Sequence, residues 1–265
     1  MEIIGYSIAL IVGITLGLIG SGGSILAVPV LAYMFSLDEK IATAYSLFIV
    51  GVAALVGGLK QNQMNNVDWR TALIFGFPAV LGVWLVRFYI VPELPDILFY
   101  IGDFSITRRM GMFGFFAVLM FLAAFSMLKN NHTKSGSGMV QYNYPLILLE
   151  GLFFGGVSGF IGAGGGFLIV PALVVLANLE IKIAIGTSLM IVAIKSILGF
   201  LLADAITVSI DWVFLLAFTV LTILGIIIGV KIGGFIDSNR LKTGFSYFLM
   251  VMAVFIFFIE FYVEH

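Results

Sequence analysis

Two glycine-rich clusters, each inside a long apolar stretch, are the residues whose types and spacing best suit the binding of a small ion. They read Gly20-Ser21-Gly22-Gly23-Ser24 and Gly162-Ala163-Gly164-Gly165-Gly166. Each glycine lowers helix stability by about 1 kcal/mol, so three together favour a break in a helix over close packing alone. A helix that restarts after a break presents unpaired N–H groups and the positive end of its dipole. Each cluster therefore predicts a half-site for a small anion.

Hydroxyl side chains begin the apolar stretch that follows each cluster, and they are candidate ligands for the same anion. They are Tyr45, Ser46, Thr187 and Ser188. A hydroxyl can bind an anion or bond the backbone of its own helix, and the sequence leaves both readings open. Ser21 and Ser24, inside the first cluster, present the same choice.

Two charged residues lie within apolar stretches, where a charge is costly and usually faces a partner or a cavity. Lys195 lies in the middle of 183–203, and Glu150 lies inside 144–177. Lys195 is a candidate anion ligand or a partner of Glu150. The alternatives are a structural pair, or a side chain that extends its ammonium to the membrane surface. Glu150 is a candidate for proton coupling.

The composition excludes several other kinds of chemistry. The 265 residues are 62% hydrophobic and 10% charged, whereas a soluble domain is about half apolar and a quarter charged. There is no cysteine, and the two histidines lie outside the apolar stretches, so we expect neither a metal site nor a bound cofactor. A net charge of −1 without a basic patch excludes nucleic acid as a partner. A mean hydropathy of +1.19 predicts a lipid bilayer as the surroundings.

Eight apolar stretches predict the membrane-spanning segments. They lie at roughly 3–35, 41–59, 71–91, 110–128, 144–177, 183–203, 211–230 and 241–262. Six have the length of one helical crossing, about 20 residues. The two longest contain the glycine clusters and exceed one crossing, so each is expected to be a helix, a break and a second helix or half-helix. Pro29 and Pro171 follow the breaks, where the first turn of a new helix accepts proline.

An internal repeat relates the two halves of the chain. With an offset of 142 residues, 18 of the 38 positions in 13–50 are identical to those in 155–192. Five of the identities are glycines, which shared apolar composition does not explain. A polar linker at 129–143 separates the halves, so the predicted organisation is membrane repeat 1–128, linker 129–143 and membrane repeat 144–265. Internal repeats with broken helices are typical of secondary transporters.

The orientation of the two repeats stays open at this stage. If the long stretches each cross twice, the halves have five crossings each and are inverted; if they cross once, the halves have four crossings and are parallel. Counting Lys and Arg in the loops gives eight against four in both cases, so the positive-inside rule does not choose between them. Both forms place both termini outside the cytoplasm. We favour the inverted form, because broken helices and inverted repeats tend to occur together.

The glycine pattern resembles that of a known family. Gly-x-x-x-Gly-x-x-Gly-x-Gly-Gly, running into Val-Pro, occurs at 13–29 and again at 155–171, and Asp-Trp recurs at 68–69 and 211–212. With the eight apolar stretches, these features resemble the TauE/SafE (TSUP) family of sulfite and sulfonate exporters over nearly the whole chain. The motif positions are Gly17, Gly20, Gly22, Gly23, Pro29, Gly159, Gly162, Gly164, Gly165, Gly166 and Pro171. One departure is Ser24 opposite Gly166, so the two half-sites need not be chemically equal.

The resemblance implies a carrier of small sulfur-containing or carboxylate anions in a prokaryotic inner membrane, often working as an exporter. Together with the repeat, it predicts an all-α polytopic protein that works by alternating access, with a midplane site at the two breaks. Coupling to protons and assembly as a homodimer are further expectations. An anion channel, or a membrane scaffold or receptor that transports nothing, remains an alternative, whereas an enzyme is not expected.

Overall fold

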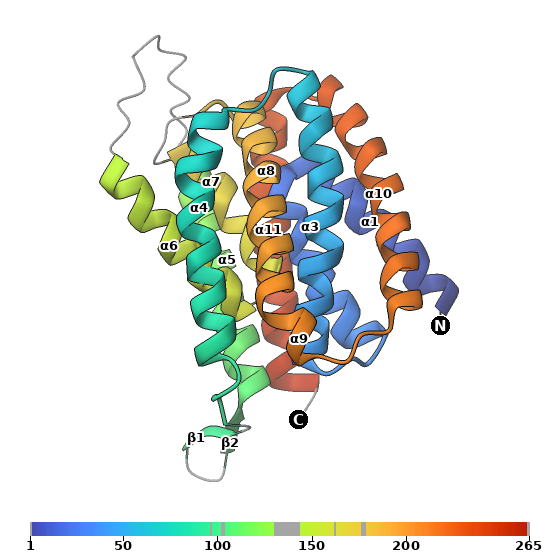
Figure 1. The fold of residues 1–265 in the computed structure, drawn as a ribbon, viewed down its shortest axis with the longest axis vertical. Coiled ribbons are helices and arrows are strands. Elements are labelled where there is room, and N and C mark those ends of the chain that lie inside the picture. Colours follow the sequence, from blue (N-terminus) through green and yellow to red (C-terminus); the bar gives the residue numbers. More distant parts are fainter. Residues whose placement is uncertain are drawn as a thin grey trace.

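The chain folds into a bundle of long apolar helices. The computed structural model describes residues 2–95, 97–101, 104–129, 144–161, 163–175 and 179–263 (Figure 1). Within these ranges, seven helical segments are long and apolar enough to cross a membrane. The predicted all-α polytopic membrane class is therefore confirmed. The long helices in these seven segments are α1 (Glu2–Ile19), α3 (Glu39–Gln63), α4 (Trp69–Leu85), α5 (Arg108–Lys129), α8 (Ile181–Gly199), α10 (Trp212–Phe235) and α11 (Ser238–Phe258). A further helix, α6 (Tyr144–Ile161), is apolar but is not one of the seven.

The outer surface of the bundle is apolar, as a bilayer requires. Phe77, Val213 and Phe235 each expose more than four fifths of their surface, at 82%, 82% and 87%. A soluble protein rarely leaves large apolar side chains so exposed in such numbers. Polar side chains are instead found inside the bundle, where they bond one another and the helix backbone.

The first glycine cluster reverses the direction of the chain. After α1, a 3₁₀ segment, η1 (Gly20–Leu26), leads into the short α2 (Ala27–Pro29) and a π-helical turn, η2 (Val30–Met34). Gly20 has φ +69°, a left-handed conformation that glycine adopts at little cost. The backbone at Gly23 lies against that of Thr15 and Leu16. Residues seven apart in a continuous helix are about 10 Å apart along the axis. This contact therefore shows that Ser7–Met34 folds back on itself and is not one straight span.

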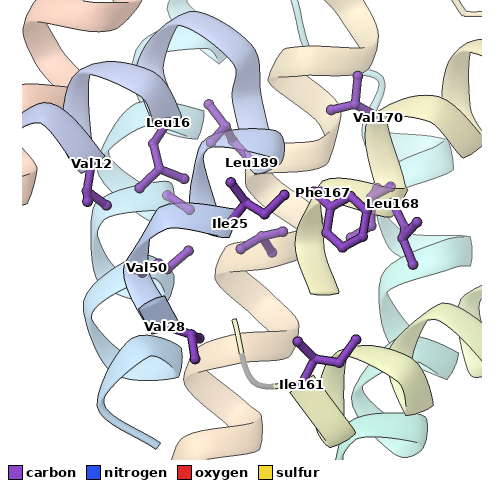
Figure 2. Packing of buried hydrophobic residues seen from close by; sticks show 14 of the residues in the cluster. Val12, Leu16, Ile25, Val28, Val50, Ile161, Phe167, Leu168, Val170 and Leu189 are labelled. Atoms are coloured by element: carbon purple, nitrogen blue, oxygen red, sulfur yellow. The ribbon is translucent and has the colours of Figure 1, made fainter. Parts of the chain in front are cut away.

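The second cluster has the same sequence of elements. It follows α6 and forms the 3₁₀ segment η4 (Ala163–Leu168), which continues into α7 (Ile169–Val175). Gly162 lies outside the described residues. The two 3₁₀ segments contact each other in the interior of the bundle. Figure 2 shows Ile25 from the first and Phe167 from the second reaching into one buried apolar cluster. We call η1 and η4 the two tips.

The Gly-x-x-x-Gly pairs allow close packing of helices. Gly13 and Gly17 of α1 lie against the backbone of α10, where a Cβ atom on either would overlap Thr222 or Ile226. Gly155 of α6 makes the corresponding contact with Ala79 of α4. These glycines therefore have the packing role that small residues usually have at helix–helix contacts in membranes.

The helix directions bear on the orientation of the repeats. Residue numbers fall along α8 as they rise along α3: a Cβ on Gly51 would lie 2.9 Å from Ile197 Cγ1, and one on Gly58 would lie 3.1 Å from Met190 Cγ. The two helices are therefore antiparallel, and Figure 1 shows α3 rising while α8 descends. A parallel four-plus-four arrangement would give these equivalent helices the same direction. The inverted five-plus-five form is compatible with the observed contacts and is carried forward as a proposal.

The connections define the two ends of the bundle. The lower end in Figure 1 carries a short antiparallel hairpin, β1 (Ile97–Ile101) and β2 (Phe104–Thr107), which the sequence reading did not anticipate. It also carries α9 (Ala205–Thr207) and the loop at 208–211, whereas the upper end carries the loop at 64–68 and the start of α8. Three π-helical turns lie at helix ends: η3 (Val86–Ile90), η5 (Phe200–Asp204) and η6 (Ile259–Val263).

Candidate functional site

The first tip is held by a serine from the other half of the chain. The Ser21 backbone N–H donates to Ser188 Oγ at 3.2 Å, and Ser188 Oγ donates to the Ile185 carbonyl at 2.8 Å. Within the tip, Ser24 Oγ donates to the Ser21 carbonyl at 2.6 Å. Ser21 Oγ itself is fully buried and has no hydrogen-bond partner among the described residues. A buried hydroxyl without a partner can accept or donate to a ligand at no cost to the fold.

The two tips approach each other most closely at Gly166. A Cβ atom there would lie 3.1 Å from Ser24 Oγ and 2.9 Å from Val192 Cγ2 of α8. The predicted juxtaposition of the two clusters is thus observed for Ser21, Ser24 and Gly166. Ala163, Gly164 and Gly165 form the preceding backbone of the second tip.

The glycines of the first tip also pack tightly. A Cβ on Gly22 would overlap the ring of Phe245 on α11, and one on Gly23 would overlap the backbone at Leu16. A larger side chain at either position would therefore disturb the fold as well as any ligand. Consequently, substitution of these glycines does not separate binding from packing.

Lys195 is fully buried one turn beyond Val192, and its ammonium donates to Ser158 Oγ of α6. Two sequence-based alternatives for it are wrong. Its side chain does not reach the surface, and it does not pair with Glu150, because Ser158 is eight residues further along α6, about 12 Å along the axis. Among the described residues, no carboxylate lies within ion-pair distance of Lys195. It is therefore a cation that lacks an anionic partner in the interior of the bundle, next to the tips.

Tyr45 and Thr187 bond the backbone of the opposite half. The Asp211 N–H donates to the Tyr45 hydroxyl at 2.6 Å, and the Asp68 N–H donates to Thr187 Oγ1 at 2.9 Å. Both aspartates cap helices, and Tyr45 and Thr187 are equivalent positions of the repeat. These two hydroxyls join the halves at opposite ends of the bundle. Ser46 Oγ donates to its own helix, at the Thr43 carbonyl, at 2.7 Å.

A buried ion pair between Arg87 and Asp204 was missed by the sequence reading. Arg87 Nε donates to Asp204 Oδ1 at 2.9 Å. It also lies 2.7 Å from Asp204 Oδ2, but this oxygen accepts no hydrogen bond among the described residues. The guanidinium also donates to the Gly159 carbonyl at 3.1 Å and to Thr43 Oγ1 at 3.2 Å. The two side chains are 2% and 8% exposed.

The sequence contained only a weak indication of this pair, namely the positions of the two charges at the ends of apolar stretches. Arg87 is four residues from the end of the apolar stretch 71–91, and Asp204 directly follows 183–203. Charges at such positions are ordinarily loop residues, and the count of positive loop residues included Arg87. Only the three-dimensional arrangement brings the end of α4 beside the end of α8 and gives each charge its partner.

A small cavity lies at the upper end of the bundle, beside the end of α3. Its volume is about 20 Å³, room for a single water molecule, and its lining includes Gly17, Gln61, Asn66, Lys182 and Ile185. Gln61 is part of α3, is 6% exposed and accepts from the Asn66 side chain at 2.9 Å, so its amide is buried and paired.

The comparison with known families decides the class of this protein. The family model for the sulfite exporter TauE/SafE matches residues 6–256. The chain belongs to the sulfite exporter TauE/SafE family. The matched residues include both glycine motifs and the two tips. The family is one of membrane transporters, and the chain is not assigned to any class of enzyme.

TauE/SafE relatives with transporter names cover most of the chain. A "probable membrane transporter protein" of Xylella fastidiosa (strain 9a5c) is 30% identical over 254 residues, which is 93% of this chain and 90% of the relative. One from Xylella fastidiosa (strain Temecula1) is 33% identical over 69% of this chain and 66% of the relative. The "probable membrane transporter protein YunE" of Bacillus subtilis is 26% identical, over 79% of this chain and 80% of its own length. No solved structure matches the chain.

Proposed function

We propose that this protein is a secondary transporter of small oxyanions, such as sulfite, sulfonates or related carboxylates, with a binding site between the two tips. The observation that carries the proposal is Lys195, a fully buried ammonium with a serine as its only partner among the described residues. Because a charge inside the membrane is costly, an unpaired cation there usually serves an ion or substrate. A bound anion would supply the missing charge.

The tips provide the remaining ligands of the proposed site. Gly166 and Val192 link the second tip to the face of α8 that carries Lys195, while Ser21 brings an unpartnered hydroxyl from the first tip. Hydroxyl and backbone N–H donors around one ammonium suit a singly or doubly charged oxyanion. The apolar cluster around the tips leaves little room, which favours small anions over bulky ones.

Alternating access follows from the inverted form of the repeat. Equivalent helices that run in opposite directions can exchange conformations, so that the tips face one side of the membrane and then the other. In this proposal the upper end, with the larger number of positive loop residues, faces the cytoplasm. Both termini then lie outside it, in a prokaryotic inner membrane. Glu150, a part-exposed carboxyl on α6, is the proposed proton-coupling group.

Transport in proteoliposomes tests this function. Uptake of radiolabelled sulfite or methanesulfonate should saturate, and preloading the vesicles with unlabelled anion should drive transient accumulation of label above equilibrium. A channel with the same ligands would give flux that does not saturate and is never driven uphill. The absence of flux for every small oxyanion in folded protein would favour a scaffold or receptor.

A further inference from the structure

Two cations meet the last turn of α6, just before the second tip. Lys195 donates to Ser158 Oγ, and Arg87 donates to the carbonyl of the next residue, Gly159, at 3.1 Å. The helix ends at Ile161, so these contacts lie at its carbonyl end, where cations are favoured. An anion that leaves Lys195 towards the lower end would therefore next meet Arg87, the second cation that contacts the end of α6.

The equivalent place in the other half holds a small cavity instead of an ion pair. Thr43 and Gly159 both accept hydrogen bonds from Arg87. Through the 142-residue offset, they correspond to Ile185 and Gly17. Both of these line the cavity at the upper end. The same position relative to the tips is thus a cavity at one end and a guanidinium with its carboxylate at the other.

Both members of the ion pair lie in π-helical turns. Arg87 belongs to η3, at the end of α4, and Asp204 is the last residue of η5, at the end of α8. Single π-helical turns are often found at functional sites. Arg87 has three partners from three elements, whereas the Asp204 carboxylate is held by Arg87 alone among the described residues. Asp204 is therefore the partner that is free to move.

We propose that the Arg87–Asp204 pair is the gate of the lower end, and that Asp204 occupies the place on Arg87 that a transported oxyanion takes as it passes. This proposal deepens the proposed function and rests on it. The guanidinium of an arginine can donate to two oxygens of a carboxylate or of a sulfonate in the same way. Opening the empty gate would leave a buried charge without a partner, which is strongly unfavourable. An arriving anion removes that penalty, so the gate opens with substrate and resists leakage without it.

Cysteine accessibility measures the gate directly, because the natural chain contains no cysteine. Ser46 is fully buried, one turn deeper than Thr43 on the same face of α3, and Ser46→Cys places a thiol behind the pair. The variant is reconstituted in vesicles, and an impermeant sulfonate-bearing thiol reagent is added. Ile206→Cys, at a position 81% exposed at the lower end, identifies the side from which the reagent acts.

The gate predicts slow labelling of Ser46→Cys from the lower side and at least a tenfold faster rate when Asp204→Asn is added. Glu39→Gln is the matched control, since it removes the carboxylate charge from the Glu39–Arg108 pair, 2.8 Å apart at the same end, but leaves Arg87 paired. Equal labelling with and without Asp204, or equal acceleration by Glu39→Gln, would overturn the gate. If Asp204→Asn does not fold, the doubly neutral Arg87→Gln/Asp204→Asn variant, which leaves neither member of the pair charged, should show the same acceleration.

Competition for Arg87 is tested by binding of methanesulfonate to purified protein. Asp204→Asn removes the competing carboxylate and should tighten the Kd about tenfold, whereas Arg87→Gln/Asp204→Asn should lose that gain. An unchanged Kd in Asp204→Asn would overturn the competition. The labelling result does not require transport, so a wild-type protein that shows a closed gate but no anion flux would reject the proposed function while leaving the gate standing.

Discussion

Replacement of Lys195 by methionine separates a ligand from a structural lysine. Methionine has a similar length and no charge, so it fills the same buried space without the cost of desolvating an ammonium. The only bond lost among the described residues is the one to Ser158 Oγ. We therefore expect Lys195→Met to unfold at the same temperature as the wild type or a higher one.

The effect on the anion should be much larger. A hydrogen bond to a charged group contributes about 1.5–3 kcal/mol. At about 1.4 kcal/mol for each factor of ten, its loss weakens the Kd for methanesulfonate by roughly 10- to 150-fold. Calorimetric binding in detergent and saturable uptake in vesicles measure this loss. Lys60→Met, at an exposed lysine near the end of α3, is the matched control and should change neither quantity. A destabilised Lys195→Met protein with unchanged affinity would show that the lysine is structural and refute the reasoning.

Four further substitutions probe the site and its surroundings. Ser21→Ala removes a buried hydroxyl without a partner, so thermal unfolding should be unchanged or slightly raised while methanesulfonate affinity falls several-fold; a large loss of stability would contradict the open ligand position. Tyr45→Phe and Thr187→Val each break one bond between the halves and should lower the free energy of unfolding by about 1 kcal/mol in denaturant titrations, with affinity unchanged. Glu150→Gln should abolish uphill uptake driven by a proton gradient but keep anion exchange; retention of proton-driven uptake would remove Glu150 from the coupling.

The breaks were predictable because glycine is a local signal. Gly20 and Gly23 disfavour a helix whatever surrounds them, and the length of 3–35 already exceeded one crossing. The structure adds why several glycines are needed at once: Gly23 rests on the backbone of Leu16, and Gly22 faces the Phe245 ring. The caps at Asp68 and Asp211 were predictable for the same reason, since a capping residue acts within its own turn.

The partners of the polar residues could not be predicted, because they depend on contacts distant in sequence. Lys195 meets Ser158 across 37 positions, and Arg87 meets Asp204 across 117. The hydroxyls that begin the later spans are an example: Ser188 holds the first tip, whereas the adjacent Thr187 bonds the Asp68 N–H. One position along a helix changes the face by about 100°, so neighbouring candidates in the sequence serve different contacts in the fold.

The most direct test of the central claim is counterflow of a labelled oxyanion in vesicles that contain the purified protein. Vesicles preloaded with unlabelled methanesulfonate are diluted into trace label, and internal label is followed over time. We predict a transient overshoot above equilibrium that saturates with external anion and is lost in Lys195→Met but not in Lys60→Met. A monotonic approach to equilibrium, or an overshoot that Lys195→Met retains in full, would contradict a carrier whose site is built around Lys195.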